Sequence, residues 1–426
     1  MKNIFKSKLV GNAAIYALAN VLNGAIPFLL LPILTRVFTP EQYGLVTLIS
    51  AVIAIMGAFT GLSVHGAVSV KYFDKEIDHP KFVGASLLVL AGSTSVVLLF
   101  LLVMGDKLSE WIHLPKQWLI IAAIASAAQF VINIRLTMWQ VKEKAIQYGF
   151  FQVTQTLFNL SLSLGLVLWL LLGWEGRAWG IVLATIVFAG FAIVTLHKEE
   201  LVHWQRNKQY TKTALSFGVP LIPHVVGGLV IATADRFVIA KFLGSESVGI
   251  FSVAMQISMV INFLVDAFLK SYSPHLFKKL SSISDKEKQT IVKNTYIIFV
   301  IFFLLSTLYI YFVGILLQFL VGEKFSSSIT YIPWLVYSAM FSGMYYLVGL
   351  YIVYAGKTHV LSIVTILVSL FHCILLYYMV SVEGLAGASK AVVASAVLMF
   401  ILTWFFSARV FPMNWMSTFK TKNKYA

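Results

Sequence analysis

Charged residues are scarce in this chain. Asp, Glu, Lys and Arg make up only 12% of its 426 residues, whereas 59% are hydrophobic. A soluble domain usually carries about 25% charged residues. One globular core cannot bury so much apolar surface, and lipid must therefore solvate much of it. The composition excludes a large soluble catalytic domain.

Cysteine and metal-ligand clusters are also nearly missing. The single Cys373 lies within an apolar run, which excludes an internal disulfide framework and a multi-cysteine metal site. His65, His224 and His372 are scattered over three apolar runs, and we expect them to be hydrogen-bonding side chains. The sequence predicts no metal and no cofactor.

Catalytic and nucleotide-binding motifs are absent as well. Gly356-Lys357-Thr358 resembles the end of a phosphate loop, but Tyr351 occupies the position of the required first glycine. The chain has no nucleophile elbow and no paired-carboxylate constellation. We therefore predict that the protein is not an enzyme, and that any transport is passive or ion-coupled.

Long apolar runs dominate instead. A helix needs about 20 apolar residues to cross roughly 30 Å of hydrocarbon, and these runs lack the strict alternation of barrel strands. We predict an all-α integral membrane protein with twelve transmembrane helices. They span residues 9–35, 43–70, 82–104, 118–138, 147–172, 178–196, 214–240, 247–269, 294–317, 328–354, 359–380 and 386–408.

The basic residues indicate the orientation of these spans. The net charge is +15, but the Lys and Arg residues lie in short gaps, which argues against a nucleic-acid partner. With alternate gaps assigned to opposite sides, one side together with both termini holds 24 of the 32 Lys and Arg residues. Cytoplasmic segments carry this excess, and we therefore place both termini in the cytoplasm.

A short internal repeat divides the chain. Arg36–Leu45 aligns without gaps on Lys241–Ile250, at an offset of 205 residues. A cation, a Glu five positions later and a Gly eight positions later recur after the first helix of each half. Six helices return the chain to its starting side, so the repeats are parallel, with a cavity expected between them near the midplane. We predict two six-helix bundles, residues 1–205 and 206–426, around a central cavity.

Polar side chains within the spans predict where this cavity lies. In the first span, one helix face carries Asn12, Tyr16, Asn20, Asn23 and Pro27. The fifth span carries Gln152, Gln155 and Asn159. A buried amide without a partner costs about 2–7 kcal/mol, so these faces must meet protein or water. Interhelical packing and a hydrated passage both satisfy them; several such faces together favour the passage.

Charged side chains in or near the spans form a second set of candidates. The cations are Arg36, Arg135, Arg236 and Lys241, and the carboxylates are Asp235 and Asp266. A charge near the bilayer centre costs at least about 2.5–3.5 kcal/mol, so these residues are expected to face a cavity or a partner. The alternatives are snorkelling to the interface for Arg36 and Lys241, and a structural ion pair with Lys270 for Asp266.

The residues around the first span also carry a motif. It reads Gly11-x4-Tyr16-x3-Asn20-x6-Pro27-Phe28-Leu-Leu-Leu-Pro32-Ile-Leu-Thr35-Arg36, followed by Pro40-Glu41-x-Tyr43-Gly44. This pattern resembles the Wzx-type O-antigen and polysaccharide repeat-unit flippases of the multidrug, oligosaccharidyl-lipid and polysaccharide exporter superfamily. Chain length, span number and the parallel repeat fit that family over the whole chain.

The resemblance implies a bacterial inner-membrane protein. Its substrate would be an undecaprenyl-diphosphate-linked oligosaccharide, such as an O-antigen repeat unit, moved from the cytoplasmic to the periplasmic leaflet by alternating access. Its partners would be this substrate and the lipid bilayer, with polysaccharide polymerase and chain-length proteins as further candidates. The four cations would attract the diphosphate, the polar faces would line the passage, and Asp235 and Asp266 would couple transport to an ion.

Three alternatives stay open. A drug/cation antiporter of the same superfamily should have a cavity dominated by acidic residues, whereas here cations outnumber them. A membrane-embedded polysaccharide polymerase or ligase should carry a large outside loop, and the longest outside gap has about 13 residues. A general sugar porter would lack the motif of the first span.

Overall fold

Helices account for the regular structure of this protein. The computed structural model describes residues 2–205, 207–280, 285–357, 359–413 and 415, and for part of the first helix and a few other positions it describes the backbone alone. No strand occurs in these ranges, and nine of their helices are long and apolar enough to cross a membrane. The predicted all-α membrane class is confirmed at this level.

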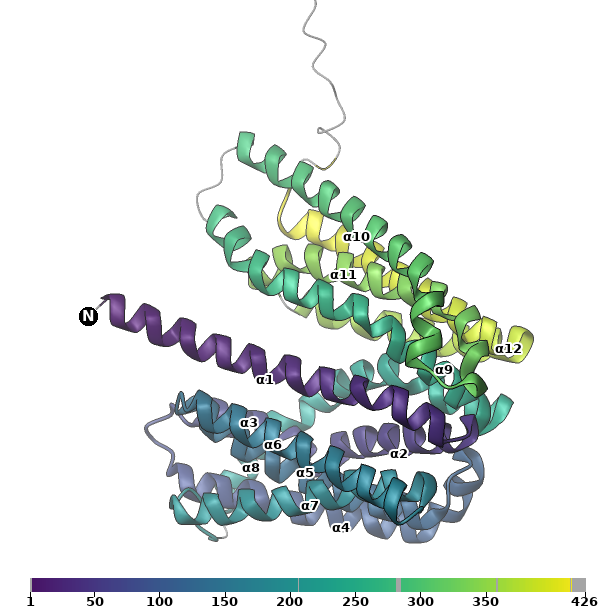
Figure 1. The fold of residues 1–426 in the computed structure, drawn as a ribbon. Coiled ribbons are helices and arrows are strands. Elements are labelled where there is room, and N and C mark those ends of the chain that lie inside the picture. The colour runs from purple at the N-terminus through teal and green to yellow at the C-terminus, as the bar shows by residue number, and fades with distance from the viewer. Residues whose placement is uncertain (1, 206, 281–284, 358, 414, 416–426) are drawn as a thin grey trace, which may run out of the picture. The chain divides into compact units, whose positions relative to one another are not determined.

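Within the described ranges, twelve α-helices follow one another, joined in places by short turns of 3-10 or π-helix (Figure 1). The α-helices are α1 (Lys2–Val37), α2 (Pro40–Phe59), α3 (His65–Lys71), α4 (His79–Ile112), α5 (Lys116–Val141), α6 (Ala145–Leu164), α7 (Gly173–Lys198), α8 (Lys208–Gly218), α9 (Ile222–Leu280), α10 (Asp285–Leu320), α11 (Ile332–Tyr354) and α12 (His359–Val410). The short elements are η1 (Gly61–Ser63), η2 (Gly165–Trp169), η3 (Val219–Leu221) and η4 (Glu323–Thr330).

The second predicted span, 43–70, is wrong as a single helix. Helix α2 ends at Phe59, and the next turn contains Gly61, Leu62 and Ser63 with φ values of 74°, 48° and 57°. These left-handed values cannot continue an α-helix. The freed backbone N–H of Gly61 donates to Ser93 Oγ at 2.8 Å, so the break is satisfied by a side chain of α4.

Two helices are much longer than one membrane crossing. Helix α9 has 59 residues and α12 has 52, or about 88 Å and 78 Å at 1.5 Å per residue. Each is broken at a glycine with positive φ, Gly244 (φ 80°) and Gly384 (φ 60°). Glycine adopts such angles without a steric penalty. The breaks fall in the predicted gaps after residues 240 and 380, which confirms those turns.

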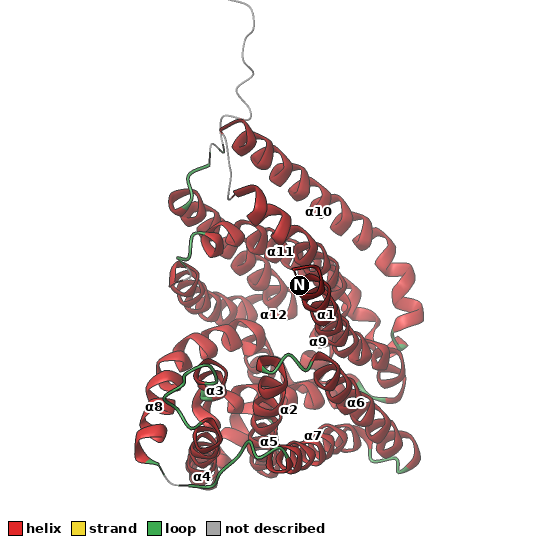
Figure 2. Ribbon diagram, turned by 90° about the vertical axis from the view of Figure 1, so that its left-hand side faces the viewer, coloured by secondary structure: helices red, strands yellow, loops and turns green. Residues whose placement is uncertain are grey.

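The chain forms two compact units. Unit 1 contains Met1–Leu229 and Leu243–Gly249, and unit 2 contains Val230–Phe242 and Ile250–Ala426. In unit 1, α5 packs against α2, α4 and α7, while α6 packs against α1 and α7 (Figure 2). In unit 2, α11 packs against α10 and α12. The predicted division into residues 1–205 and 206–426 stays a prediction.

Each unit has its own apolar core. The core of unit 1 includes Phe82, Phe130 and Ile132, and the short helix α8 packs onto it through Ala214. One core cluster of unit 2 surrounds Tyr351, whose hydroxyl lies 3.2 Å from Thr295 Oγ1. Both cores mix aliphatic and aromatic side chains from several helices, as expected for helices packed side by side.

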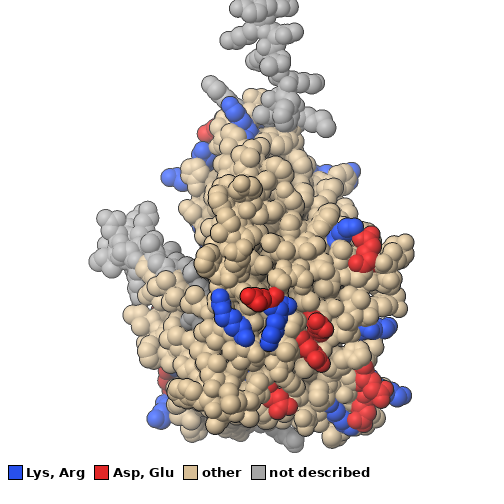
Figure 3. Space-filling view, turned by 45° about the vertical axis from the view of Figure 1, so that its right-hand side comes forward, with Lys and Arg blue, Asp and Glu red and all other residues tan. Residues whose placement is uncertain are grey.

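Large apolar side chains also cover much of the outside. On one face of α4, Val96, Phe100 and Val103 are 66%, 53% and 79% exposed. Charged side chains are few on the surface shown in Figure 3 and gather in small groups between wide uncharged areas. Water would solvate such a surface poorly, whereas the hydrocarbon of a bilayer suits it.

The two segments of the internal repeat meet within unit 1. A Cβ atom on Gly44 would lie 1.9 Å from the carbonyl oxygen of Ser245, and one on Gly249 would lie 1.9 Å from that of Pro40. The offset of 205 residues relates Pro40 to Ser245 and Gly44 to Gly249. The two contacts are therefore equivalent, and each repeat supplies the glycine against which the backbone of the other repeat packs.

We predict that neither glycine tolerates a side chain. Gly44→Ala or Gly249→Ala should destabilise the protein by about 1–3 kcal/mol, because a backbone carbonyl cannot move aside as a side chain can. Thermal unfolding of the purified protein in detergent measures this effect. Gly57→Ala, with no heavy atom within 4 Å of the added methyl group, is the matched control. Equal unfolding temperatures for the three variants would contradict the prediction.

Candidate functional site

One face of α6 carries a continuous polar stripe, made of Gln152, Thr156, Asn159 and Ser163. Their spacings of four, three and four residues place them on the same side of the helix. They extend over more than three turns of a helix that packs against both α1 and α7. The α6 stripe is therefore the main polar element of unit 1 within its apolar helices.

Helix α1 meets the first part of the α6 stripe. Thr156 Oγ1 lies 2.5 Å from Asn23 Oδ1 and donates a hydrogen bond to it. Gln152 Oε1 is buried and accepts no hydrogen bond from the described residues. Gln155 is half-buried beside the stripe, and the side chain of Asn20 lies outside the described residues. The structure thus brings Asn23 of α1 into contact with the α6 stripe at Thr156, and the role of Asn23 and Gln152 in a passage stays a prediction.

The second part of the stripe binds an arginine that the sequence analysis overlooked. Arg177 Nη1 donates to Asn159 Oδ1 at 2.5 Å and to Ser163 Oγ at 2.6 Å. The sixth predicted span begins at residue 178, which places Arg177 in the gap before it, on the side opposite to the termini. Helix α7 begins at Gly173, so Arg177 lies within its first turns. The sequence feature that indicates a buried partner such as Arg177 is the pair of polar residues Asn159 and Ser163, which lie one turn apart on α6.

Arg135 is buried and paired with other side chains of the protein. It is only 1% exposed, and its Nη2 forms an ion pair with Glu199 Oε1. Its guanidinium also lies 4.0 Å from the ring centre of Trp139. Lys142 and Lys144 approach the other carboxylate oxygen of Glu199, at 3.9 Å and 3.5 Å. Glu199 balances the charge of Arg135, while Nε and Nη1 of Arg135 have no hydrogen-bond partner among the described residues, and a role in substrate binding stays a prediction.

The electrostatics of Glu199 follow from this cluster. Partial burial acts to raise the pKa of the Glu199 carboxyl group. The hydrogen bond from Arg135 and the charges of the three cations together lower that pKa by more than burial raises it. The net result is a pKa below the ordinary value. Glu199 is therefore a carboxylate at neutral pH, and the ion pair with Arg135 is intact there.

The repeat-related cations have different surroundings. Arg36 is exposed, and its Nη1 donates to the carbonyl oxygen of Pro32 at 2.7 Å. Lys241 is also exposed, with its Nζ 5.2 Å from the ring centre of Tyr377 and 5.6 Å from that of Phe242. Equivalent positions in the repeat thus hold one cation against its own helix and the other against two aromatic rings.

Unit 2 contains a buried acidic group in α9. Asp235 is 2% exposed, and its Oδ1 accepts no hydrogen bond from the described residues. The closest described cation is Arg236, with Nη1 at 3.8 Å and a hydrogen bond of its own to the carbonyl oxygen of Ala232. A buried carboxylate with so few partners is costly unless it binds a proton or a cation.

His372 of α12 lies in the same environment. It is 2% exposed and within electrostatic range of Asp235. Its Nδ1 lies 2.9 Å from Ser395 Oγ, while its Nε2 has no partner among the described residues. Asp235 and His372 are therefore two buried titratable side chains within electrostatic range of each other, and Ser395 contacts His372. The sequence suggested Asp235 alone, because His372 and Ser395 lie more than 130 residues away along the chain.

Asp266 differs from Asp235. Its side chain is 57% exposed, and Oδ2 forms a 2.6 Å ion pair with Lys270 one turn further along α9. The predicted partner is thus confirmed, and this pair is an ordinary exposed contact. The described residues contain no group of three or more His, Cys, Asp or Glu side chains that could hold a metal ion.

Known proteins share this arrangement of helices. Residues 9–279 match the model of a family described as "Polysaccharide biosynthesis protein". The chain belongs to this family. The match covers more than half of the chain and confirms the resemblance to the polysaccharide exporter superfamily seen in the residues of the first span.

Relatives within and beyond this family are distant in sequence. "Lsg locus putative protein 1" of Haemophilus influenzae is 24% identical over 86% of this chain and 90% of its own. "Capsular polysaccharide biosynthesis protein CapF" of Staphylococcus aureus is 22% identical over 95% and 100%. The inward closed lipid II flippase MurJ has a TM-score of 0.71 at 13% identity, covering 93% of this chain and 87% of MurJ.

A second structural neighbour is a drug transporter. An inward-facing MATE family multidrug resistance transporter of the MOP superfamily has a TM-score of 0.70 at 16% identity, covering 92% of this chain and 94% of that transporter. At such low identity these two likenesses concern the fold. The fold is therefore one found in both a lipid flippase and a drug transporter.

The Arg135–Glu199 pair yields a prediction about stability. Glu199→Gln should destabilise the protein by about 2–4 kcal/mol at neutral pH, because Arg135 would keep a buried charge without a counter-ion. The pKa of Glu199 is lowered in the folded state, so its contribution is present above the ordinary carboxyl pKa and is lost as pH falls through the folded value.

Thermal unfolding as a function of pH tests this. The gap between wild type and Glu199→Gln should be full at pH 7 and shrink below the ordinary carboxyl range. Glu200→Gln changes the exposed neighbouring carboxylate and should leave the unfolding temperature unchanged. A Glu199→Gln variant as stable as Glu200→Gln would refute the assignment.

Proposed function

We propose that this protein is a flippase for a polyprenyl-diphosphate-linked oligosaccharide, such as an O-antigen or related surface polysaccharide repeat unit. It moves the unit from the cytoplasmic to the periplasmic leaflet of a bacterial inner membrane by alternating access. The observation that carries this proposal is the α6 stripe with Arg177, a polar surface within apolar helices of a chain from a polysaccharide biosynthesis family.

The lengths of the helices support a twelve-span arrangement. Helices α1, α2, α4, α5, α6, α7, α10 and α11 each count as one span. Helices α9 and α12 are each long enough for two spans, and each is broken at a glycine. This gives two sets of six, with both termini in the cytoplasm according to the distribution of Lys and Arg.

The substrate explains why polar side chains occupy the interior of unit 1. A sugar headgroup carries many hydroxyl groups, and each costs several kcal/mol in hydrocarbon when it has no partner. A polyprenyl tail can stay in lipid. Amides and hydroxyls along α6 supply donors and acceptors for a glycan, while arginine suits a diphosphate because its guanidinium donates in a forked geometry.

The proposed sites in the passage are the following. Arg36, Arg135, Arg236 and Lys241 attract the anionic headgroup, and Asn20, Asn23, Gln152, Gln155 and Asn159 line the path of the glycan. Arg177 joins this set because it contacts Asn159 directly. The charge of Arg135 acts at a distance in this proposal, since the side chain is buried against Glu199.

Ion coupling is assigned to Asp235. Its burial and its incomplete set of partners favour reversible binding of a proton or a monovalent cation, with His372 beside it. Asp266 is the second candidate, although its exposure and its pairing with Lys270 make it less suited to the role.

A drug/cation antiporter is the second candidate function. The specific observation in its favour is the same buried carboxylate, together with the likeness to a MATE transporter fold. An antiporter for organic cations would protect cells from cationic compounds and would leave surface glycan unaffected. A polymerase or ligase is less favoured, because the described gaps between helices are short.

A gene deletion tests the proposed function. Without this protein, complete single lipid-linked units should accumulate on the cytoplasmic leaflet and polymer should be lost; expression of the chain should restore both. The leaflet is read from the accessibility of the sugars to a membrane-impermeant oxidant in spheroplasts. Unpolymerised units on the periplasmic leaflet would favour a polymerase instead, and unchanged glycan with lowered resistance to organic cations would favour the antiporter.

Asp235→Asn tests ion coupling. The substitution keeps the shape and removes the titrating charge, so we expect transport to fall at least tenfold at normal protein levels. Transport into inverted vesicles with an imposed proton or sodium gradient measures this. Asp106→Asn, on an exposed carboxylate, is the control, and Asp266→Asn compares the second candidate. Gradient-dependent transport by Asp235→Asn at the wild-type rate would remove Asp235 from the mechanism.

A further inference from the structure

Helix α8 (Lys208–Gly218) precedes the long helix α9 and packs against α3 and α4 through one face. Ala214 and Gly218 are buried on this face, and Tyr210 contacts the ring of Phe82. A Cβ atom on Gly218 would lie 2.3 Å from the carbonyl oxygen of Leu62. The helix is thus held closely against unit 1, and its orientation is fixed.

The opposite face of α8 borders a hollow of about 780 Å³, within the size range of small-molecule sites. Its described lining belongs entirely to unit 1 and consists of Asn207, Lys208, Thr211, Lys212, Leu215, Ser216, Val219 and Pro220. The chemical type of these residues changes along the helix. The cations come first, and the apolar side chains follow toward α9.

The two lysines of this face carry unneutralised charge. Within the described part of the chain, no carboxylate lies within ion-pair distance of Lys208 or Lys212. In the acidic loop of residues 72–78, Asp74 pairs with Lys71 and Asp78 pairs with Lys81, both at 2.8–2.9 Å, and Glu76 is not within ion-pair distance of Lys208 or Lys212. The residues one turn apart on a helix have Cβ atoms about 5–6 Å apart, so the two ammonium groups can reach one ligand.

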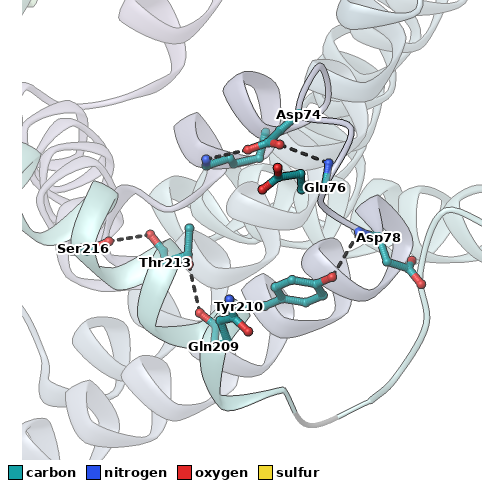
Figure 4. Close-up of polar contacts among 8 residues, drawn as sticks. Asp74, Glu76, Asp78, Gln209, Tyr210, Thr213 and Ser216 are labelled. Atoms are coloured by element: carbon teal, nitrogen blue, oxygen red, sulfur yellow. Dashed lines mark hydrogen bonds and ion pairs between the residues drawn. The ribbon is translucent and has the colours of Figure 1, made fainter.

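Figure 4 shows how the acidic loop is held on the packed side of α8. Tyr210 accepts a hydrogen bond from the backbone N–H of Asp78 at 3.1 Å, and Asp74 accepts from Lys71 and from the N–H of Glu76. The free N–H groups at the start of α8 are also occupied, since Asn207 Oδ1 accepts from Gln209 and Tyr210. The lysines are therefore the anion-binding groups on this face.

We propose that this face of α8 is the entry site for the polyprenyl diphosphate carrier of the substrate. The diphosphate binds Lys208 and Lys212, with the hydroxyl groups of Thr211 and Ser216 beside them, and the first isoprene units lie along Leu215, Val219 and Pro220. This inference rests on the proposed function and adds the place where the lipid carrier is first bound.

The two lysines and the narrow row of apolar side chains on this face favour a polyprenyl diphosphate over bulk phospholipid. A diphosphate presents two adjacent phosphates, which matches two ammonium groups one helical turn apart. A phosphatidylglycerol headgroup presents one phosphate. The single isoprenoid chain fits a narrow row of three apolar side chains, whereas a phospholipid brings two acyl chains.

The experiment measures binding of farnesyl diphosphate to the full-length protein in nanodiscs of zwitterionic lipid. The double variant Lys208→Gln/Lys212→Gln should weaken binding at least tenfold. The matched control Lys293→Gln/Lys357→Gln removes two exposed lysines of unit 2 and should bind as wild type does. Leu215→Ser/Val219→Ser should weaken binding of farnesyl diphosphate and leave that of inorganic diphosphate unchanged.

The outcomes separate this inference from the proposed function. Equal binding by wild type and Lys208→Gln/Lys212→Gln would overturn the entry site and leave the flippase proposal standing. Full displacement of farnesyl diphosphate by equimolar phosphatidylglycerol would also overturn it, because the face would then be a general anionic-lipid site. A wild-type protein that binds no prenyl diphosphate, together with lipid-linked units that still reach the periplasmic leaflet in the gene-deletion strain, would refute the proposed function itself.

Discussion

The hydrocarbon of a bilayer offers no hydrogen bonds, and this one constraint governs the whole chain. Every backbone N–H and C=O group within it must be paired inside the protein, which leaves helices as the solution for segments of this length. At the interruption after α2, the freed N–H of Gly61 donates to Ser93 Oγ. The helical hydrogen bonding of α9 and α12 is interrupted at Gly244 and Gly384, which both have positive φ.

The same constraint gives meaning to each polar side chain in the interior. Thr156, Asn159 and Ser163 satisfy one another, α1 and Arg177 through short hydrogen bonds. Arg135 pairs with Glu199 through Nη2 and lies over the ring of Trp139, while its Nε and Nη1 have no hydrogen-bond partner among the described residues. Asp235 and His372 are titratable side chains among the groups whose buried atoms lack partners among the described residues.

Much of the fold could be read from the sequence because hydropathy and glycine positions are local signals. The turns near residues 244 and 384 were predicted from short polar gaps. The break at Gly61 was not, because Leu62 and Val64 continue the apolar run and only the backbone angles reveal the turn. Similarly, the start of α7 five residues before its predicted position concealed Arg177.

The candidate sites were harder to predict because they depend on contacts between distant segments. The one-sided spacing of Gln152 and Asn159 located the polar face of α6, but Arg177 and Thr156 complete it through tertiary contacts. Arg135 was chosen for its charge near a membrane span, and Glu199, which balances that charge, lies 64 residues away. Local spacing identifies a face, whereas the partners of that face are a property of the folded chain.

The contact between the two repeat segments has an evolutionary consequence. Gly44 and Gly249 meet the backbones of Ser245 and Pro40, and backbone atoms are the same in every sequence. Almost every neighbouring side chain can therefore drift while the contact persists. A duplicated half can therefore keep this joint through two glycines while its other side chains change.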